Sequence, residues 1–158
     1  MSFVSIMKKK QTKILLFVFL GVIGAYLLLV GISAVMMSQM TRITYSSVYK
    51  GEKFETIIVD FEENTVQQIF FDRDTGEQWA SYENSIDIST KNKIKATCSF
   101  SLFPLWRKSY FDRSVYDGIQ YSITRTYGNG ESIVSGSNAY PLTYDCVMRA
   151  IRNAVSDQ

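Results

Sequence analysis

An uncharged apolar run near the N-terminus, residues 14–37, constrains this 158-residue chain more than any other feature. It reads ILLFVFLGVIGAYLLLVGISAVMM. At about 1.5 Å of rise per residue, a helix of this length crosses the roughly 30 Å hydrocarbon core of a bilayer. We therefore expect one transmembrane helix over residues 14–37, with the lipid bilayer as its partner.

A cleaved signal peptide is the competing interpretation, because basic residues also precede the apolar stretch of such peptides. That stretch has about 7–15 residues and ends at a site of small residues. Here the nearest candidate site, Ile32-Ser33-Ala34, has a large residue where a small one is needed. The pattern favours an uncleaved signal-anchor in a single-pass protein.

The charges flanking the run predict its orientation. Lysines at positions 8, 9, 10 and 13 precede it, and only Arg42 follows closely. Because basic flanks stay inside, we expect residues 1–13 in the cytoplasm and residues 38–158 outside the cell membrane. The latter part has fewer basic residues than its 15 acidic ones. No clustered positive surface for nucleic acid is predicted.

Residues 38–158 have the size of one domain, and much of their sequence alternates with the period of a strand. The alternation is strongest over residues 119–127. Gly128-Asn129-Gly130 and a second alternating stretch, 131–135, follow, which predicts a hairpin with a type I′ turn. Polar turns separate four further predicted strands, at 43–49, 54–61, 66–71 and 77–82.

Two segments have helical spacing. Near the C-terminus, apolar residues from Tyr144 to Val155 fall on one face, which predicts an amphipathic helix packed on the sheet. Residues 91–103 fit a strand and a helix equally well. For a helix there, Ser89 or Thr90 is the candidate N-cap, and Pro104 is the candidate end.

The last third of the predicted extracytoplasmic part, residues 38–158, resembles a family. Asp117-Gly118, Tyr121-Ser122-Ile123, the glycine turn and Gly136-Ser137-Asn138-Ala139-Tyr140-Pro141 before a helix are similar to "DG..WSL.I.Y.DG......GSNAYP". That pattern belongs to uncharacterised envelope or lipoprotein-like domains, mainly of Gram-positive bacteria. Tyr121 replaces its tryptophan, and Arg125 replaces an inward aliphatic residue.

The resemblance implies a fold and no reaction. In the family the segment before the tryptophan corresponding to Trp106 is helical, which favours a helix around residues 90–103. We therefore predict an α+β protein with one transmembrane helix and a small antiparallel sheet of meander and hairpins. A helix near 90–103 and the C-terminal helix complete it.

The sequence contains no histidine, which excludes Ser-His and Cys-His pairs and histidine zinc sites. Asp74-Thr75-Gly76 resembles an aspartic-protease triplet, but charged residues flank it, so a turn is expected. Asp72, Asp74 and Glu83 only loosely follow the spacing of a calcium loop. We predict no catalytic residue, metal ligand or cofactor.

Cys98 and Cys146 are the only cysteines, and both are expected outside the cytoplasm, where disulfides persist. Cys98 belongs to the apolar stripe of its segment. Cys146 lies on the side of the last helix away from the apolar face. A Cys98–Cys146 disulfide and two separate thiols both remain open.

One segment mixes cations with aromatic rings: Trp106, Arg107, Lys108, Tyr110 and Arg113. This composition is typical of a contact surface for a protein or an envelope polymer. The competing interpretation, which we favour, is a loop whose rings enter the core while its charges stay in water.

Two isolated features have weaker implications. Arg125 stands alone on an apolar strand face, so we expect it to reach out at a sheet edge or to pair with a carboxylate. Gly21 and Ala25 form a small-xxx-small pair, a weak indication that the transmembrane helix self-associates.

These observations predict a non-enzymatic, membrane-anchored extracytoplasmic module that binds a protein or component of the bacterial cell envelope. One alternative is a glycan hydrolase that uses two of four carboxylates: Asp72, Asp74, Asp112 and Asp117. The other is an immunity or accessory subunit whose anchor contacts another membrane protein.

Overall fold

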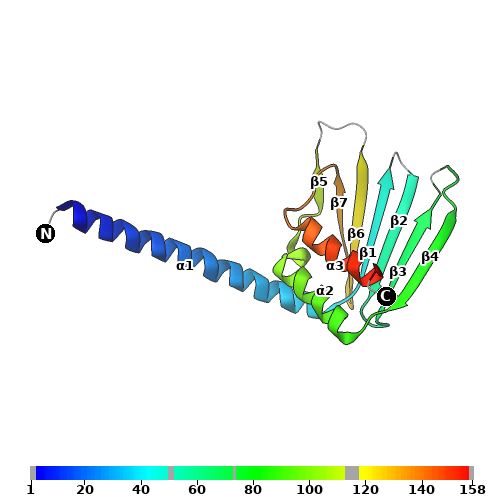
Figure 1. Cartoon of the computed structure of the whole chain (residues 1–158), viewed down its shortest axis with the longest axis horizontal. Helices are drawn as coiled ribbons and strands as arrows, with labels where there is room; N and C mark the ends of the chain where they lie inside the picture. Colours follow the sequence, from blue (N-terminus) through cyan, green and yellow to red (C-terminus); the bar gives the residue numbers. More distant parts are fainter. Residues whose placement is uncertain (1–2, 50–51, 73, 113–117, 157–158) are drawn as a thin grey trace.

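The computed structural model describes residues 3–49, 52–72, 74–112 and 118–156 and has an α+β fold (Figure 1). A long helix, α1 (Phe3–Ser38), leads almost directly into β1 (Met40–Tyr49). The elements that follow are β2 (Glu52–Asp60), β3 (Thr65–Phe71), β4 (Gln78–Ser85), α2 (Ile88–Phe100), the short 3₁₀ helix η1 (Phe103–Leu105), β5 (Ser109–Phe111), β6 (Ile119–Tyr127), β7 (Gly130–Ser137) and α3 (Tyr144–Ser156).

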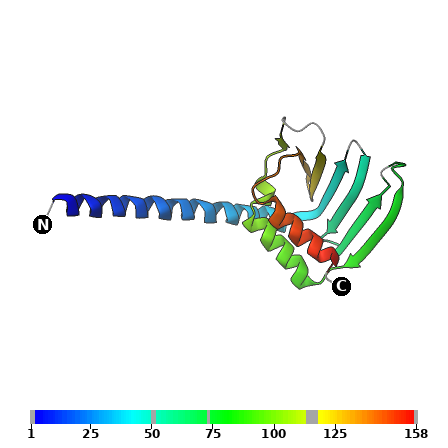
Figure 2. The same cartoon turned by 45° about the horizontal axis from the view of Figure 1, so that its top comes forward.

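Helix α1 contains the predicted span and projects from the domain (Figure 2). Its stretch Lys13–Ser38 is long and apolar enough to cross a membrane. Side chains over 14–29 are exposed, whereas Ser33 and Met37 are buried against the domain. The last turns of α1 therefore belong to the folded domain as well as to the apolar segment.

The strands form one sheet in the order β4-β3-β2-β1-β6-β7-β5. Neighbours are antiparallel except β5, which runs parallel to β7. The six strands predicted from alternation are all present, and β5 was not predicted. The pairing of β1 with both β2 and β6 places β4 at one end of the sheet and β5 at the other.

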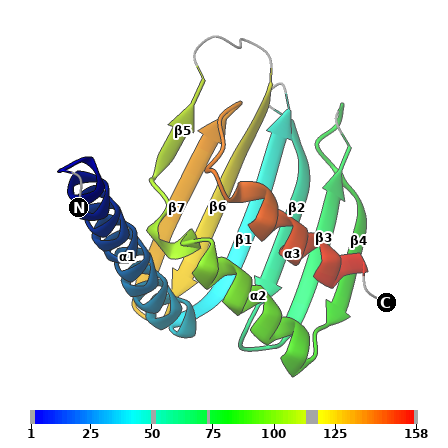
Figure 3. The same cartoon turned by 60° about the vertical axis from the view of Figure 1, so that its left-hand side comes forward.

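Helices α2 and α3 lie across one face of the sheet (Figure 3). Residues paired across strands share a face, and the pairs Ile43 with Val59 and Ile123 with Val134 are buried on this one. The helices cover them with Ile94, Cys98, Val147 and Ile151. The opposite face carries mainly hydroxyl and amide side chains, among them Thr44, Gln67 and Thr124.

Helix α2 begins and ends elsewhere than the sequence indicated. Asp87 is its N-cap, because its carboxylate accepts a hydrogen bond from the Thr90 amide at 2.7 Å. The helix ends at Phe100, well before Pro104, and Leu102 reverses the chain with a φ of 53°. Neither Ser89 nor Thr90 caps the helix.

The β6–β7 hairpin is confirmed, but its predicted turn type is wrong. Tyr127 pairs with Gly130, so the two turn residues are Gly128 and Asn129. A type I′ turn needs positive φ at both, and neither residue has it; Gly130, at 149°, does. The Asn-Gly pair lies one position too late for that turn.

Candidate interaction site

In the segment considered as a cation-aromatic contact surface, the ring of Trp106 and the neighbouring charges separate, as the favoured loop interpretation expects. Trp106 is 8% exposed, and its Nε1 donates to the carbonyl oxygen of Ser101 at 3.2 Å and to Thr143 Oγ1 at 3.3 Å. Arg107 and Lys108 are exposed, and Tyr110 is half-buried. The ring thus enters the core while the charges stay in water. Arg113 lies outside the described residues.

Arg125 does not reach a sheet edge, and it pairs with no carboxylate among the described residues. It is 4% exposed on the interior strand β6. Its Nη1 donates to the carbonyl oxygens of Phe103 and Pro104, each at 2.8 Å, and its Nε donates to Ser132 Oγ at 2.9 Å. Burial lowers the pKa of this guanidinium. The arginine holds the η1 turn onto the sheet.

The two cysteines are free thiols and not a disulfide. Cys98 is buried on the inner side of α2, whereas Cys146 is exposed on α3. Burial raises the pKa of the Cys98 thiol to about 12, which keeps it protonated and unreactive at neutral pH.

Asp72, one of the four carboxylates considered for a hydrolase, does not have the electrostatics of a general acid. Asp72 Oδ1 accepts hydrogen bonds from the amides of Asp74 and Thr75, each at 2.9 Å. The Thr75 amide and then the Asp74 amide hold the Asp72 pKa below its usual value. A general acid needs a raised pKa. Asp112 is exposed, and Asp117 lies outside the described residues.

The residues that resemble the family pattern pack on one another. The rings of Tyr121 and Tyr140 stack with centroids 5.1 Å apart, and Tyr121 Oη donates to the Ala139 carbonyl oxygen at 3.1 Å. A Cβ on Gly136 would lie 2.4 Å from the Tyr121 ring. Within the described residues, these contacts give the pattern a structural role.

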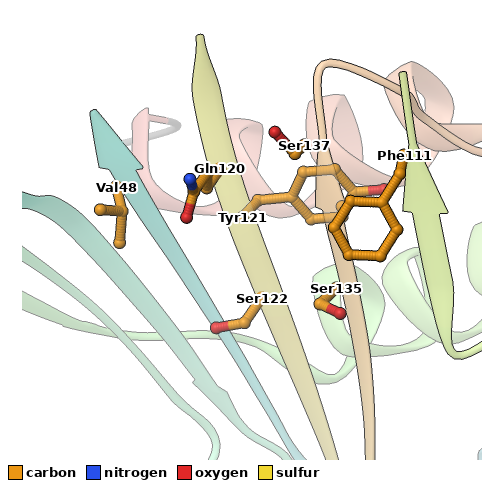
Figure 4. A pocket seen from close by; sticks show the side chains of 8 residues that line it. Val48, Phe111, Gln120, Tyr121, Ser122, Ser135 and Ser137 are labelled. Carbon is orange, nitrogen blue, oxygen red and sulfur yellow. The ribbon is translucent and has the colours of Figure 1, made fainter. Parts of the chain in front are cut away.

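The open face of the sheet has a shallow groove of about 350 Å³ (Figure 4). It is lined by Val48, Phe111, Gln120, Tyr121, Ser122, Ser135, Gly136 and Ser137. These side chains supply hydrogen-bonding groups and two rings, with no carboxylate or cation.

Strand β4 is the more exposed of the two sheet edges. It is eight residues long, whereas β5, the other edge strand, has three. Its sequence QWASYENS contains one charged residue, Glu83, and no lysine or proline. Long edge strands without such residues readily pair with another chain, because one row of their backbone groups has no strand beside it.

Two large aromatic side chains stand on this edge. Trp79 is 65% exposed and Tyr82 is 56% exposed. Their ring centroids lie 5.6 and 6.3 Å from that of Phe70 on β3. We call these three residues the β4 aromatic cluster. A groove of about 380 Å³ adjoins it, between Trp79, Phe54 and Asp74.

Tyr82 and Phe70 of the β4 aromatic cluster lie on the helix-bearing face of the sheet, and Trp79, whose ring contacts Phe70, is the extra residue of a bulge in β4. Tyr82 pairs with Gln68, which shares its face with the buried Val66. Figures 1 and 2 place β4 on the side of the domain farthest from α1. Sequence reasoning predicted this strand but did not single out Trp79, because the order of strands in the sheet is not visible in the alternation.

The chain was also compared with known proteins. No protein-family model matches it, and no curated protein matches it.

Proposed function

We propose that this protein is a non-catalytic, single-pass membrane module whose β4 edge binds an extended segment of another extracytoplasmic protein. The partner segment adds a strand beside β4 and packs its side chains on the β4 aromatic cluster. The observation that carries this proposal is the combination, on one edge strand, of an open backbone edge and two exposed aromatic residues.

The chemistry of the edge suits this mode of binding. In strand addition, main-chain hydrogen bonds supply affinity and alternate side chains supply specificity. Tryptophan and tyrosine are the residues most often responsible for binding energy at protein interfaces. Trp79 and Tyr82 flank Ala80 and Ser81, whose small side chains leave the backbone of β4 accessible.

The position of the edge also suits a membrane-anchored binder. Helix α1 meets the domain on the side opposite β4, so an anchor in the bilayer leaves β4 facing away from it (Figure 1). The basic residues that precede the apolar segment support placing the domain outside the cytoplasm.

Photocrosslinking in cells tests the proposal. A photoreactive amino acid is placed at Ser81, which precedes Tyr82 on the edge strand, and separately at Ile133 on β7, which is 55% exposed and serves as the matched control. We expect a discrete crosslinked partner from Ser81 and none from Ile133.

The variant Trp79→Ala/Tyr82→Ala should reduce the Ser81 crosslink at least about tenfold, because one such ring commonly contributes more than 1.4 kcal/mol. Its thermal unfolding midpoint is measured alongside to show that the domain remains folded. Equal crosslinking from both positions, or an unchanged crosslink in the double variant, contradicts the proposal. A crosslink to a second copy of the chain would identify the partner as the protein itself.

A further inference from the structure

The free part of α1 is shorter than a bilayer is thick. The lysine at position 13 marks the expected cytoplasmic boundary, and Tyr26 is already held by the domain, because its hydroxyl donates to the Phe100 carbonyl oxygen at 2.8 Å. The stretch 14–25 between them spans about 18 Å at 1.5 Å per residue. The hydrocarbon core is about 30 Å thick. The missing length corresponds to residues 26–33, which lie beside the domain.

The surface of the domain beside this part of α1 is apolar. A groove of about 460 Å³ joins Leu29 of α1 to Leu102, Leu105, Pro141 and Leu142 of the domain. Leu142 is fully exposed, and Leu105 and nearby Phe100 are exposed as well. Arg107 lines the same groove, and Lys108 follows it on the surface.

The carbonyl groups that connect α2 to η1, next to the groove, already have their hydrogen bonds. Every carbonyl oxygen over 99–104 accepts one from within the chain. The donors are Leu102 N for Ser99, Tyr26 Oη for Phe100, Trp106 Nε1 and Thr143 Oγ1 for Ser101, Leu105 N for Leu102, and Arg125 Nη1 for Phe103 and Pro104. Irregular backbone tolerates hydrocarbon only when its polar groups are satisfied in this way.

We propose that this margin of the domain is seated in the outer leaflet of the bilayer, with a phospholipid acyl chain in the groove beside Leu29. Leu105 and Leu142 contact acyl chains, and Arg107 and Lys108 lie at the level of the lipid phosphates. The domain margin and residues 26–33 beside it thereby complete the hydrophobic thickness that the free part of α1 lacks. The inference rests on the proposed membrane anchor and is independent of the proposed β4 partner.

Spin labels on the full-length chain test this seating. Cys146→Ser removes the exposed thiol, while the buried Cys98 stays unlabelled. Single cysteines then replace Leu142, Phe17 on the exposed part of α1, and Glu83 on β4. The protein is reconstituted in vesicles of equal parts phosphatidylethanolamine and phosphatidylglycerol. The relaxation of each spin label by oxygen, which concentrates in the bilayer, is compared with its relaxation by a water-soluble nickel complex.

We expect oxygen to relax the labels at positions 17 and 142 more strongly than the nickel complex does, and the nickel complex to relax the label at position 83 more strongly. Because Leu142 is fully exposed, its replacement leaves the packing unchanged. Oxygen dominance at 17 with nickel dominance at 142 overturns the seating and leaves the anchor intact. Nickel dominance at both positions overturns the anchor and the seating together.

Discussion

Arg125 donates a hydrogen bond from Nη1 to the carbonyl oxygen of Phe103 at 2.8 Å, across 22 residues of chain. The same nitrogen serves Pro104, so one cation satisfies two successive carbonyl groups of the η1 turn. Its guanidinium carbon also lies 5.7 Å from the centroid of the Phe103 ring. A single side chain on the sheet thus fixes the turn that connects α2 to β5.

Replacing Arg125 with methionine should destabilise the domain by about 1–3 kcal/mol, because the Pro104 carbonyl loses its partner, whereas the Phe103 carbonyl keeps the Trp106 amide at 3.2 Å. Urea unfolding of the detergent-solubilised chain measures the loss. The exposed Arg149 on α3 supplies the matched control, Arg149→Met. Equal stability of the two variants would contradict the stabilising role assigned to Arg125.

The two thiols should differ sharply in reactivity. At pH 8, Cys146 should react rapidly with a maleimide, whereas Cys98 should react only on unfolding, because burial raises its pKa to about 12. Mass spectrometry before and after denaturation counts the labels. In intact cells a membrane-impermeant maleimide should also label Cys146, since the domain is expected outside. If Cys146 is labelled only after lysis, the predicted orientation is wrong.

Gly136→Ala should cost about 2 kcal/mol, the usual range for inserting a methyl group into a packed core. The new Cβ would lie 2.4 Å from the Tyr121 ring, which is held by its stacking on Tyr140. Thermal unfolding of Gly136→Ala and of Gly128→Ala, whose Cβ would meet nothing within 4 Å, provides the comparison. In a Tyr121→Leu background the cost of the alanine should fall.

Stability should decrease in acid partly through Asp60. Burial by itself raises the Asp60 pKa, but hydrogen bonds from the Glu63 amide, Arg42 and the Glu62 amide outweigh it and hold the pKa below its usual value. Arg42 Nε and Nη2 lie 2.9 and 2.6 Å from Asp60 Oδ2.

A depressed folded-state pKa stabilises the protein above the ordinary aspartate pKa of about 3.9, and this contribution disappears as pH falls through the folded value. Asp60→Asn should therefore be less stable than the parent near neutrality, with a difference that shrinks in acid. Unfolding curves at several pH values measure it, with Asp74→Asn on the exposed turn as control. A constant difference would argue against this role for Asp60.

Local patterns predicted the elements well. The alternation over 119–127 gave β6 its bounds, and the spacing around Val147 gave α3 its buried face. Residues 91–103 contain both periods, so the helix there followed only from the resemblance. The N-cap was missed because Asp87 lies just upstream of the two hydroxyl residues considered.

Features set by contacts distant in the sequence were not predictable. The hydrogen-bond partner of Trp106, Thr143, lies 37 residues away, and the environment of Arg125 depends on a turn more than 20 residues upstream. The exposure of Trp79 depends on β1 pairing with β6, which leaves β4 at the end of the sheet. None of these relationships has a local signature.

The direct passage from α1 into β1, reinforced by Tyr26 and by the packing of α1 on α2, leaves no flexible tether between anchor and domain. In a bilayer spanned by α1, β4 is then carried at a constant height and tilt. The search for the partner strand proposed above then becomes two-dimensional and is confined to one thin layer parallel to the membrane. A segment presented at another height would go unrecognised, however well its sequence fitted the edge.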